Sequence, residues 1–277
     1  MSTRTLLRLA LSAALALALG KAVWAEVPVG GHAATPSALR VCADPHNLPF
    51  SDEKGEGFEN KIAQLIGQDL SLPVEYFWFP QVIGFVRVGL NGGHCDLVIG
   101  TVVGDELMQT TTPYYRTGYV LVFPRDKPVP ANLDDPALKA LHIGVVGGTP
   151  PSNLLVRHGL MANAKPYDLT VDTRVENPAH QMLLDVASGA IDAGMVWGPF
   201  AGYYIKHDKL PLAMAPLQQE PGIPPLTYQI AMGTRHGDAA WHQRIEEVLQ
   251  RRQQDITAIL RDYGVPLLDN KGESAKP

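Results

Sequence analysis

The feature that most restricts the fold of this chain is an alternation of short apolar strands with amphipathic helices. In the first half, strands are expected at 39–43, 74–79 and 96–99, with apolar residues at helical spacing after residues 58 and 82. The pattern starts again after residues 119–123, with strands expected at 142–146, 191–196 and 228–232 and helices between them. Such alternation predicts an α/β protein with a mostly parallel sheet and right-handed crossovers.

The amino terminus has the composition of a secretory signal. Arg4 and Arg8 precede an apolar block over residues 9–19, and Val23-Trp24-Ala25 has small or neutral residues where a signal peptidase cuts. We therefore expect residues 1–25 to be a signal peptide that is cleaved after Ala25. The alternative is a membrane anchor, for which the block is short, because a spanning helix needs about 20 apolar residues.

The charge balance excludes two classes of partner. Loss of residues 1–25 would leave 20 basic against 28 acidic residues. A chain with a net negative charge repels nucleic acid and anionic lipid rather than attracting them. We therefore expect neither nucleic acid nor membrane as a partner. The polar end of the chain, residues 269–277, is expected to be a disordered tail.

Short motifs follow one another along the chain at Pro49-Phe50-Ser51, Gly57-Phe58-Glu59, Pro113-Tyr114-Tyr115, Gly148-Thr149 and residues 188–193. In this order and spacing they resemble the type II periplasmic binding proteins, in particular the family that binds polar amino acids. The resemblance implies two α/β lobes joined by two hinge strands. Lobe one would comprise residues 38–123 and 228–268, and lobe two residues 126–224. The ligand cleft would lie between the lobes, at the carboxyl ends of the strands.

Two positions depart from that family. The arginine that grips the ligand carboxylate in amino-acid binders corresponds to Gly104 here, and the aspartate that meets the ligand ammonium corresponds to Trp197. A zwitterion taken out of water needs a paired charge at each end. We therefore expect the cleft not to bind the standard amino acids.

A narrower resemblance covers Leu39 to Ser51, the segment Gly55 to Lys61, the block Trp78-Phe79-Pro80-Gln81 and Cys95 to Gly100. These segments are similar to the MoxJ/XoxJ type, periplasmic proteins that accompany pyrroloquinoline-quinone (PQQ) methanol dehydrogenases. The resemblance implies an accessory role in maturing or activating such a dehydrogenase. The implied partners are a PQQ-dependent alcohol dehydrogenase, its cytochrome c, or a small-molecule ligand.

The candidate cleft residues are Asp44, Asn47, Phe50, Phe79, Gly100, Thr101, Tyr114, Tyr115, Gly148, Thr149 and Trp197. Alternate residues of a strand face opposite sides, so one of Trp78 and Phe79 should lie in the core, and Phe79 is the better cleft candidate. One of Tyr114 and Tyr115 should likewise face the cleft and the other the core.

The segment Gly148-Thr149 allows two interpretations. It lies where the N-terminus of a helix could hold an anion or a carboxyl group. Alternatively, Thr149 or Ser152 is an ordinary helix cap. The sequence does not separate the two.

The two cysteines, Cys42 and Cys95, fall on or beside strands of lobe one that are expected to be neighbours, and export to an oxidising compartment favours a disulfide. A bridge needs Cα atoms within about 7 Å, and the sequence does not show whether the two strands place the cysteines at such a distance. The histidines show no metal-ligand spacing, so we expect no metal and no cofactor.

Three functions compete. The first is a non-enzymatic accessory protein that binds a partner segment in an apolar cleft. The second is the substrate-binding component of an ABC importer for a small, mostly uncharged solute. The third is an enzyme, which would need a cleft carboxyl with a raised pKa, and Glu59 and Asp44 are the nearby acids. We expect the protein not to be an enzyme.

Overall fold

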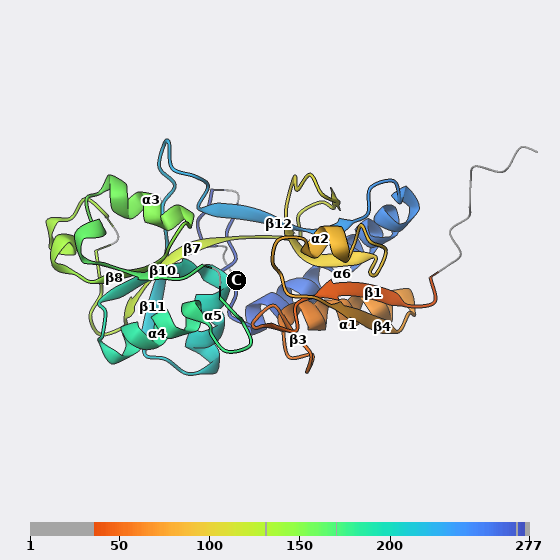
Figure 1. Ribbon diagram of the computed structural model, residues 1–277, viewed down its shortest axis with the longest axis horizontal. Coiled ribbons are helices and arrows are strands. Elements are labelled where there is room, and N and C mark those ends of the chain that lie inside the picture. Colours follow the sequence, from red (N-terminus) through yellow and green to blue (C-terminus); the bar gives the residue numbers. More distant parts are fainter. Residues whose placement is uncertain (1–35, 131, 170, 270, 275–277) are drawn as a thin grey trace, which may run out of the picture. The chain divides into compact units, whose positions relative to one another are not determined.

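The computed structural model describes residues 36–130, 132–169, 171–269 and 271–274, so the expected signal peptide and part of the expected tail lie outside the described residues. Ten of the strands form one mixed sheet in the order β4-β1-β5-β12-β7-β10-β8-β9, with β6 beside β12 and β11 beside β7. Two groups of elements, the lobes, share this sheet, and Figure 1 shows β7 and β12 running from one to the other. This is the expected fold class.

Lobe one carries parallel strands from the first half of the chain. In sequence order its elements are β1 (Leu39–Ala43), β2 (His46–Asn47), β3 (Ser51–Asp52), α1 (Phe58–Leu70), β4 (Val74–Trp78), α2 (Phe85–Val88), β5 (Leu97–Val102) and β6 (Gln109–Thr110). The end of the chain adds β12 (Thr227–Thr234) and α6 (Ala239–Asp262). The core lies where the apolar faces of α1 and α6 pack on β1 and β5, with Ile62, Ile66, Ile245 and Leu249 buried.

One helix of lobe one is shorter than its apolar spacing predicts. The residues from 82 to 90 have helical periodicity, but α2 is a single turn. Glycines bound it on both sides: Gly84 is its N-cap with a φ of 101° and Gly89 its C-cap. A positive φ is favourable only for glycine, and it cannot continue a right-handed helix.

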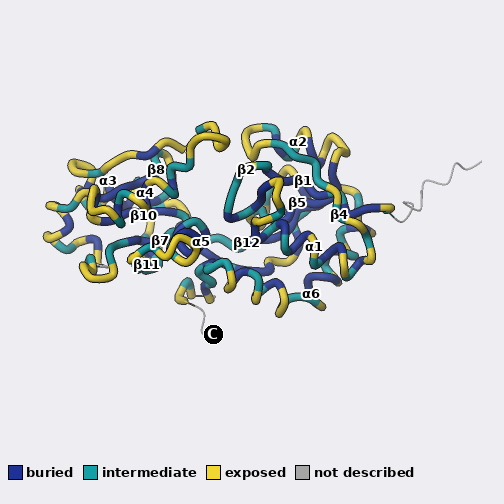
Figure 2. Tube along the Cα trace, turned by 90° about the horizontal axis from the view of Figure 1, so that it is seen from below, coloured by how far each residue is buried: buried dark blue, intermediate teal, exposed yellow. Residues whose placement is uncertain are grey.

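Lobe two repeats the α/β pattern. Its elements are β7 (Tyr115–Pro124), the 3-10 turn η1 (Pro136–Ala140), β8 (Ile143–Val146), α3 (Pro150–Arg157), η2 (Met161–Asn163), β9 (Ala164–Tyr167), α4 (Pro178–Ser188), β10 (Ala193–Trp197), α5 (Gly198–His207) and β11 (Leu212–Pro216). Separate buried clusters lie on the two faces of its sheet. In Figure 2 the buried residues of both lobes follow the strands and the inner faces of the helices, while the loops are exposed.

The two hinge strands are β7 and β12, which pair with each other in antiparallel fashion from Thr227 opposite Gly118 to Ile230 opposite Tyr115. From Tyr119 onward β7 changes partners and pairs with β10 and β11 of lobe two. A Cβ atom at Gly118 would lie 2.7 Å from the Leu226 carbonyl oxygen, so the crossing needs a residue without a side chain. The expected lobe boundaries stay a prediction, and these pairings support a proposal in which the crossover lies just after Gly118.

Cys42 and Cys95 form the predicted disulfide, with Cα atoms 5.4 Å apart. Cys42 lies late in β1, where its neighbour across the parallel pair is Val98 of β5, and Cys95 precedes that strand. The bridge therefore ties the loop before β5 to β1, in a buried cluster with Phe85, Leu90 and Met108.

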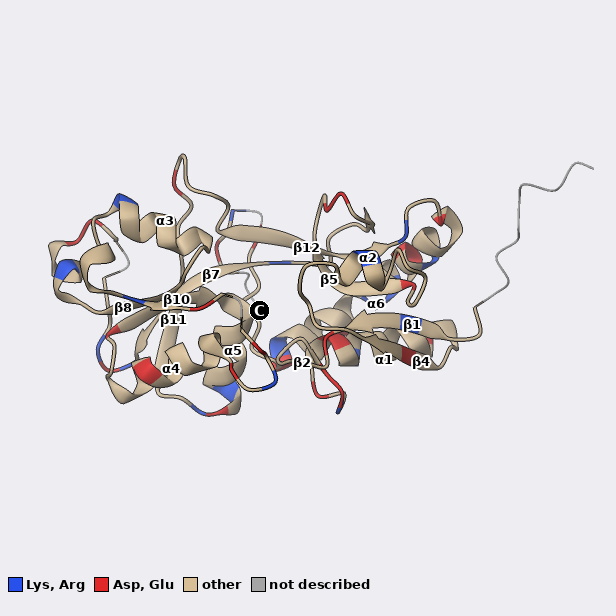
Figure 3. Ribbon diagram, in the orientation of Figure 1, with Lys and Arg blue, Asp and Glu red and all other residues tan. Residues whose placement is uncertain are grey.

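Among the described residues, no helix is both long and apolar enough to cross a membrane. Lys and Arg residues are dispersed over both lobes rather than gathered on one face (Figure 3).

Candidate functional site

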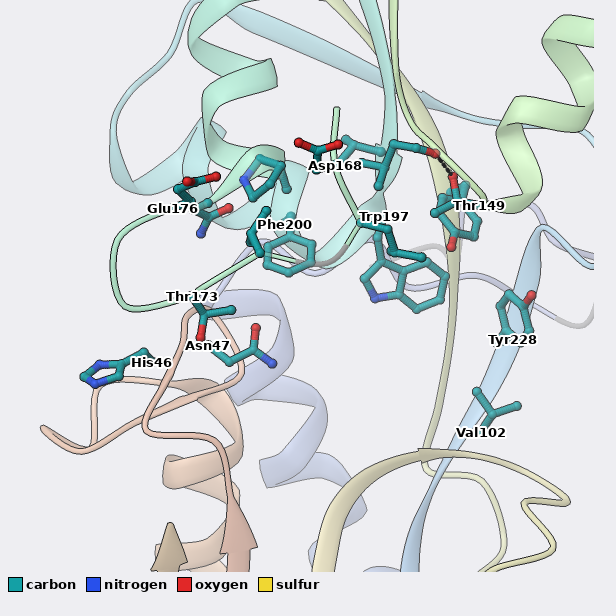
Figure 4. A pocket seen from close by; sticks show the side chains of 18 residues that line it. His46, Asn47, Val102, Thr149, Asp168, Thr173, Glu176, Trp197, Phe200 and Tyr228 are labelled. Atoms are coloured by element: carbon teal, nitrogen blue, oxygen red, sulfur yellow. Dashed lines mark hydrogen bonds between the residues drawn. The ribbon is translucent and has the colours of Figure 1, made fainter. Parts of the chain in front are cut away.

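A cavity of about 540 Å³ lies between residues of the two lobes. Lobe one contributes His46, Asn47, Val102 and Tyr228, from β2, β5 and β12. Lobe two contributes more of the wall, including Tyr119, Thr149, Asp168, Glu176, Trp197 and Phe200. Figure 4 shows His46 and Asn47 opposite the Phe200 and Trp197 side chains. The volume is typical of small-ligand sites.

Trp197 is the central aromatic residue of the cavity. It ends β10 and is the N-cap of α5. Its indole meets the Tyr119 ring at a centroid distance of 5.0 Å and the Tyr228 ring at 5.7 Å, both nearly edge to face. Burial raises the pKa of Tyr119 to about 12, and burial also raises that of Tyr228, so both phenols stay neutral. The hinge strands thus supply two of the three rings.

Three of the predicted site residues, Asn47, Thr149 and Trp197, line this cavity together. The Asn47 amide donates a hydrogen bond to Gln81 Oε1 at 3.0 Å. The Thr149 hydroxyl donates to the Val146 carbonyl at 2.6 Å.

The first turn of α3 supports neither interpretation of Gly148-Thr149 in full, because Thr149 holds the N-cap position but its side chain makes no capping hydrogen bond. Thr149 is the N-cap, and the helix begins with Pro150 and Pro151, which have no N–H to offer an anion. The next N–H, that of Ser152, donates to the Thr149 carbonyl oxygen at 3.0 Å. This helix end therefore has little capacity to bind a carboxylate.

Tyr114 and Tyr115 do not line the cavity, because both lie in the core of lobe one. The Tyr114 hydroxyl donates to the Ile99 carbonyl at 3.0 Å, and its own carbonyl accepts from Gln253 of α6 at 2.8 Å. The expected alternation of cleft and core fails here, since the chain is covered on both sides where it enters β7.

Three other candidates support the loop between β1 and α1 or the disulfide cluster. Asp44 is buried, and its carboxylate accepts from the backbone N–H groups of His46 at 2.8 Å and Gln81 at 2.7 Å. Phe50 packs between Phe58 and Phe200, with centroids 5.1 and 5.3 Å away. Phe79 packs against the cluster around the disulfide. None of the three lines the cavity.

Gly100 and Thr101 border a separate depression beside α2. The lack of a side chain at Gly100 makes room for the Glu59 carboxyl group, which a Cβ atom there would strike. Burial, and then the nearby Asp44 carboxylate, raise the pKa of Glu59 to about 8. A general acid would need such a pKa. However, Glu59 does not line the interlobe cavity, so it does not meet a ligand held there.

Sequence reasoning missed the loop between β9 and α4. Asp168, Leu169, Val171, Thr173 and Glu176 of this loop all line the cavity. No periodicity marks a loop of this kind, and its place over the cavity depends on the packing of lobe two. The two acids gave no separate signal in the sequence, because Lys165 stands three residues before Asp168 and Arg174 stands two residues before Glu176.

The two departures from amino-acid binders have clear structural settings. Gly104 lies in the turn after β5 with a φ of 86°, where it presents no side chain to a ligand. Trp197 fills the wall of the cavity. No Lys or Arg is among the described residues that line it. Nor does the described part of the chain hold a group of three or more His, Cys, Asp or Glu placed to bind a metal ion.

A pair of α/β lobes joined by two crossing strands, with a cavity between them, defines a binding protein of the solute-receptor class. The model of the bacterial extracellular solute-binding proteins, family 3, matches residues 39–265, and the chain belongs to this family. Within the family it is of the MoxJ/XoxJ type.

Three relatives support this assignment. The chain is 32% identical to protein MoxJ of Methylorubrum extorquens AM1, over 85% of this chain and 84% of that protein. It is 41% identical in sequence to the periplasmic binding protein XoxJ from Methylobacterium extorquens AM1. The match to the crystal structure of that protein has a TM-score of 0.71 and covers 84% of this chain and 100% of XoxJ. MxaJ from Methlophaga aminisulfidivorans MPT is 27% identical in sequence. The match to its crystal structure has a TM-score of 0.70 and covers 83% of this chain and 100% of MxaJ.

Proposed function

We propose that the protein is a non-enzymatic accessory factor of the periplasm that binds a segment of a PQQ-dependent alcohol dehydrogenase, or of its cytochrome c, in the interlobe cavity. The observation that carries the proposal is the cavity wall itself. Aromatic rings line it, and the cation and the aspartate that a zwitterionic nutrient needs are replaced by Gly104 and Trp197. The MoxJ/XoxJ relatives supply the class of partner.

The physical basis is the contact that aromatic residues offer. Trp and Tyr side chains provide large apolar area at low entropy cost and dominate the energetics of protein interfaces. Catalysis would remain with the dehydrogenase. The accessory protein would stabilise one conformation of the enzyme, for example one that is open for loading, because a binder shifts an equilibrium only through differential affinity.

Replacement of Trp197 by Ala should weaken the complex with the dehydrogenase by about 2 kcal/mol, roughly thirtyfold in Kd. Purified apo and holo dehydrogenase, titrated by calorimetry, provide the measurement. Trp78→Ala is the matched control, since Trp78 is also half-buried but stacks on Tyr76 outside the cavity, at a centroid distance of 4.5 Å. The control should stay within about threefold of the wild type.

The proposal is contradicted if neither form of the dehydrogenase binds the wild type at micromolar concentration, or if deletion of the gene leaves dehydrogenase activity intact. An importer role is then the second candidate. A cavity of about 540 Å³ has the size of a small-solute site and supports it. Loss of uptake of a small uncharged solute in the deletion strain would support the importer role.

Residence in the periplasm requires export, and the expected signal lies outside the described residues. We predict that the mature protein from its native host begins at Glu26, because cleavage is expected after Ala25. Edman sequencing or mass spectrometry of the abundant form checks this prediction. An abundant form that begins at Met1 would contradict it.

A further inference from the structure

We propose that the interlobe cavity selects an organic cation carried on an apolar body, that is, an ammonium or guanidinium group without a neighbouring carboxylate. Where the cation is a Lys or Arg side chain of the partner segment, this inference rests on the proposed function. A free alkyl- or arylammonium ion offers the same chemistry to the same site.

The first reason is the charge of the wall. Of the described lining residues, Asp168 and Glu176 are the acids, and none is Lys or Arg. Neither carboxylate has a hydrogen bond or an ion pair within the described structure. The nearest basic residue of their loop, Arg174, is paired with Asp172 at 2.6 Å. Figure 4 shows Asp168 and Glu176 on the same side of the cavity as Phe200 and Trp197.

Among the described lining residues, His46 is the side chain that can take up a positive charge. It stands on the lobe one side, opposite the acidic loop, and contributes to lowering the pKa of Asp172 in that loop. The two free carboxylates therefore make the electrostatic potential in the cavity negative. This potential attracts a positive group and repels an anion.

The second reason is the arrangement of the aromatic rings. The planes of Tyr119 and Tyr228 are inclined at 65° and 68° to that of Trp197. The face of an aromatic ring carries negative charge density, and a cation within about 6 Å of its centroid is attracted. Burial raises the pKa of both tyrosines, so the attraction comes from the ring faces and not from a phenolate.

The third reason is that no described lining residue offers a Lys or Arg side chain to a carboxylate. The α3 terminus begins with Pro150 and Pro151, which have no N–H to donate. A ligand carboxylate would lose its hydration without a charged partner. The geometry thus separates a simple organic cation from a zwitterion, although both carry an ammonium group.

The test compares three probes that differ only in their polar end: phenylpropylamine, phenylpropanol and phenylpropanoate. Calorimetry at neutral pH and fixed ionic strength should show that the amine binds about tenfold more tightly than the alcohol, since each exposed carboxylate adds about threefold. Phenylpropanoate and the zwitterion phenylalanine should bind more weakly than the alcohol. Equal binding of amine and alcohol, or no amine binding at millimolar concentration, overturns the proposal.

The double variant Asp168→Asn, Glu176→Gln should lose the preference for the amine, about tenfold, while its affinity for the alcohol stays the same. The matched control is Glu53→Gln with Glu106→Gln, which removes the same net charge from exposed residues outside the cavity. A preference that survives in the double variant, or that falls equally in the control, overturns the assignment to these two carboxylates.

Blocked peptides distinguish the two sources of the cation. Acetyl-Leu-Phe-Lys-amide should bind more tightly than its norleucine analogue if the ligand is a protein side chain. Binding of the amine alone assigns the site to a free organic cation and still supports the cation preference. If the amine binds but the dehydrogenase does not, the proposed function fails and this inference stands. If the dehydrogenase binds wild type and double variant equally, while the amine shows no preference over the alcohol, the inference alone fails.

Discussion

Glu59→Gln is expected to make the protein more stable than the wild type at pH 9, by about 2 to 5 kcal/mol, and to leave its stability at pH 4 unchanged. Glu59 is a half-buried residue whose carboxyl group lies over Gly100, away from solvent, and burial raises the pKa of that group from 4.5 to about 8. In the first turn of α1 the helix dipole favours the charged form by up to about 1 kcal/mol, which is smaller than the cost of burial.

The sign follows from proton linkage. Below pH 4.5 the carboxyl is protonated in both the folded and the unfolded chain, so its full contribution to stability is present. Between pH 4.5 and about 8 the unfolded chain releases a proton that the folded chain retains, and the free energy of unfolding falls. Glutamine has the same shape as the glutamic acid side chain and remains neutral at every pH. The free energy of unfolding of the variant therefore does not fall through this position.

Urea unfolding of both proteins between pH 4 and pH 9 provides the measurement, and the difference between the two curves isolates Glu59 from every other titrating group. Glu53→Gln, a change at an exposed glutamate in the preceding turn, serves as the control and should show no such pH-dependent difference. Parallel curves for Glu59→Gln and wild type would show that this carboxyl is ionised in the folded protein.

Removal of the disulfide is expected to have the largest effect on stability. The Cys42→Ala, Cys95→Ala double variant should lose about 3 to 4 kcal/mol and roughly 10 °C in Tm. The cysteines are 53 residues apart, and a bridge that closes a loop of this length restricts the unfolded chain by about 4 kcal/mol.

Thermal unfolding with and without reductant separates the effect of breaking the disulfide from the effect of removing the two buried sulfur atoms. Reductant should lower the Tm of the wild type by a similar amount and leave that of the double variant unchanged. Two free thiols on alkylation of the non-reduced native protein would contradict the prediction.

The sequence was informative about the fold because the fold depends on periodicity. The apolar run at 39–43 is β1, the run at 191–196 contains most of β10 (Ala193–Trp197), and the pattern that restarts after residues 119–123 continues through the second lobe. The exception is α2, where Gly84, with its positive φ, interrupts a helical pattern. The register of the disulfide could not be settled without coordinates, because it depends on how β1 and β5 lie side by side.

The site was less accessible to sequence reasoning. The predicted residues that line the cavity, Asn47, Thr149 and Trp197, each follow or end a strand, where ligand sites of α/β proteins form. Tyr114 and Tyr115 were misplaced because strand alternation presumes one solvated face, whereas helices and sheet enclose both residues. Asp168 and Glu176 were missed, since only the tertiary packing of lobe two brings a loop without periodicity over the cavity.

The crossing of β7 and β12 also fixes an order of events in time. Lobe two lies in the chain between the first residues of β7 and β12, so β5 must wait for its neighbour β12 until all of lobe two has been synthesised. Lobe two, by contrast, is continuous in the chain from Tyr119 to Pro216. A chain that emerges amino terminus first therefore presents the open edge of β5 to its surroundings, and the last segments to arrive, β12 and α6, are those that cover it.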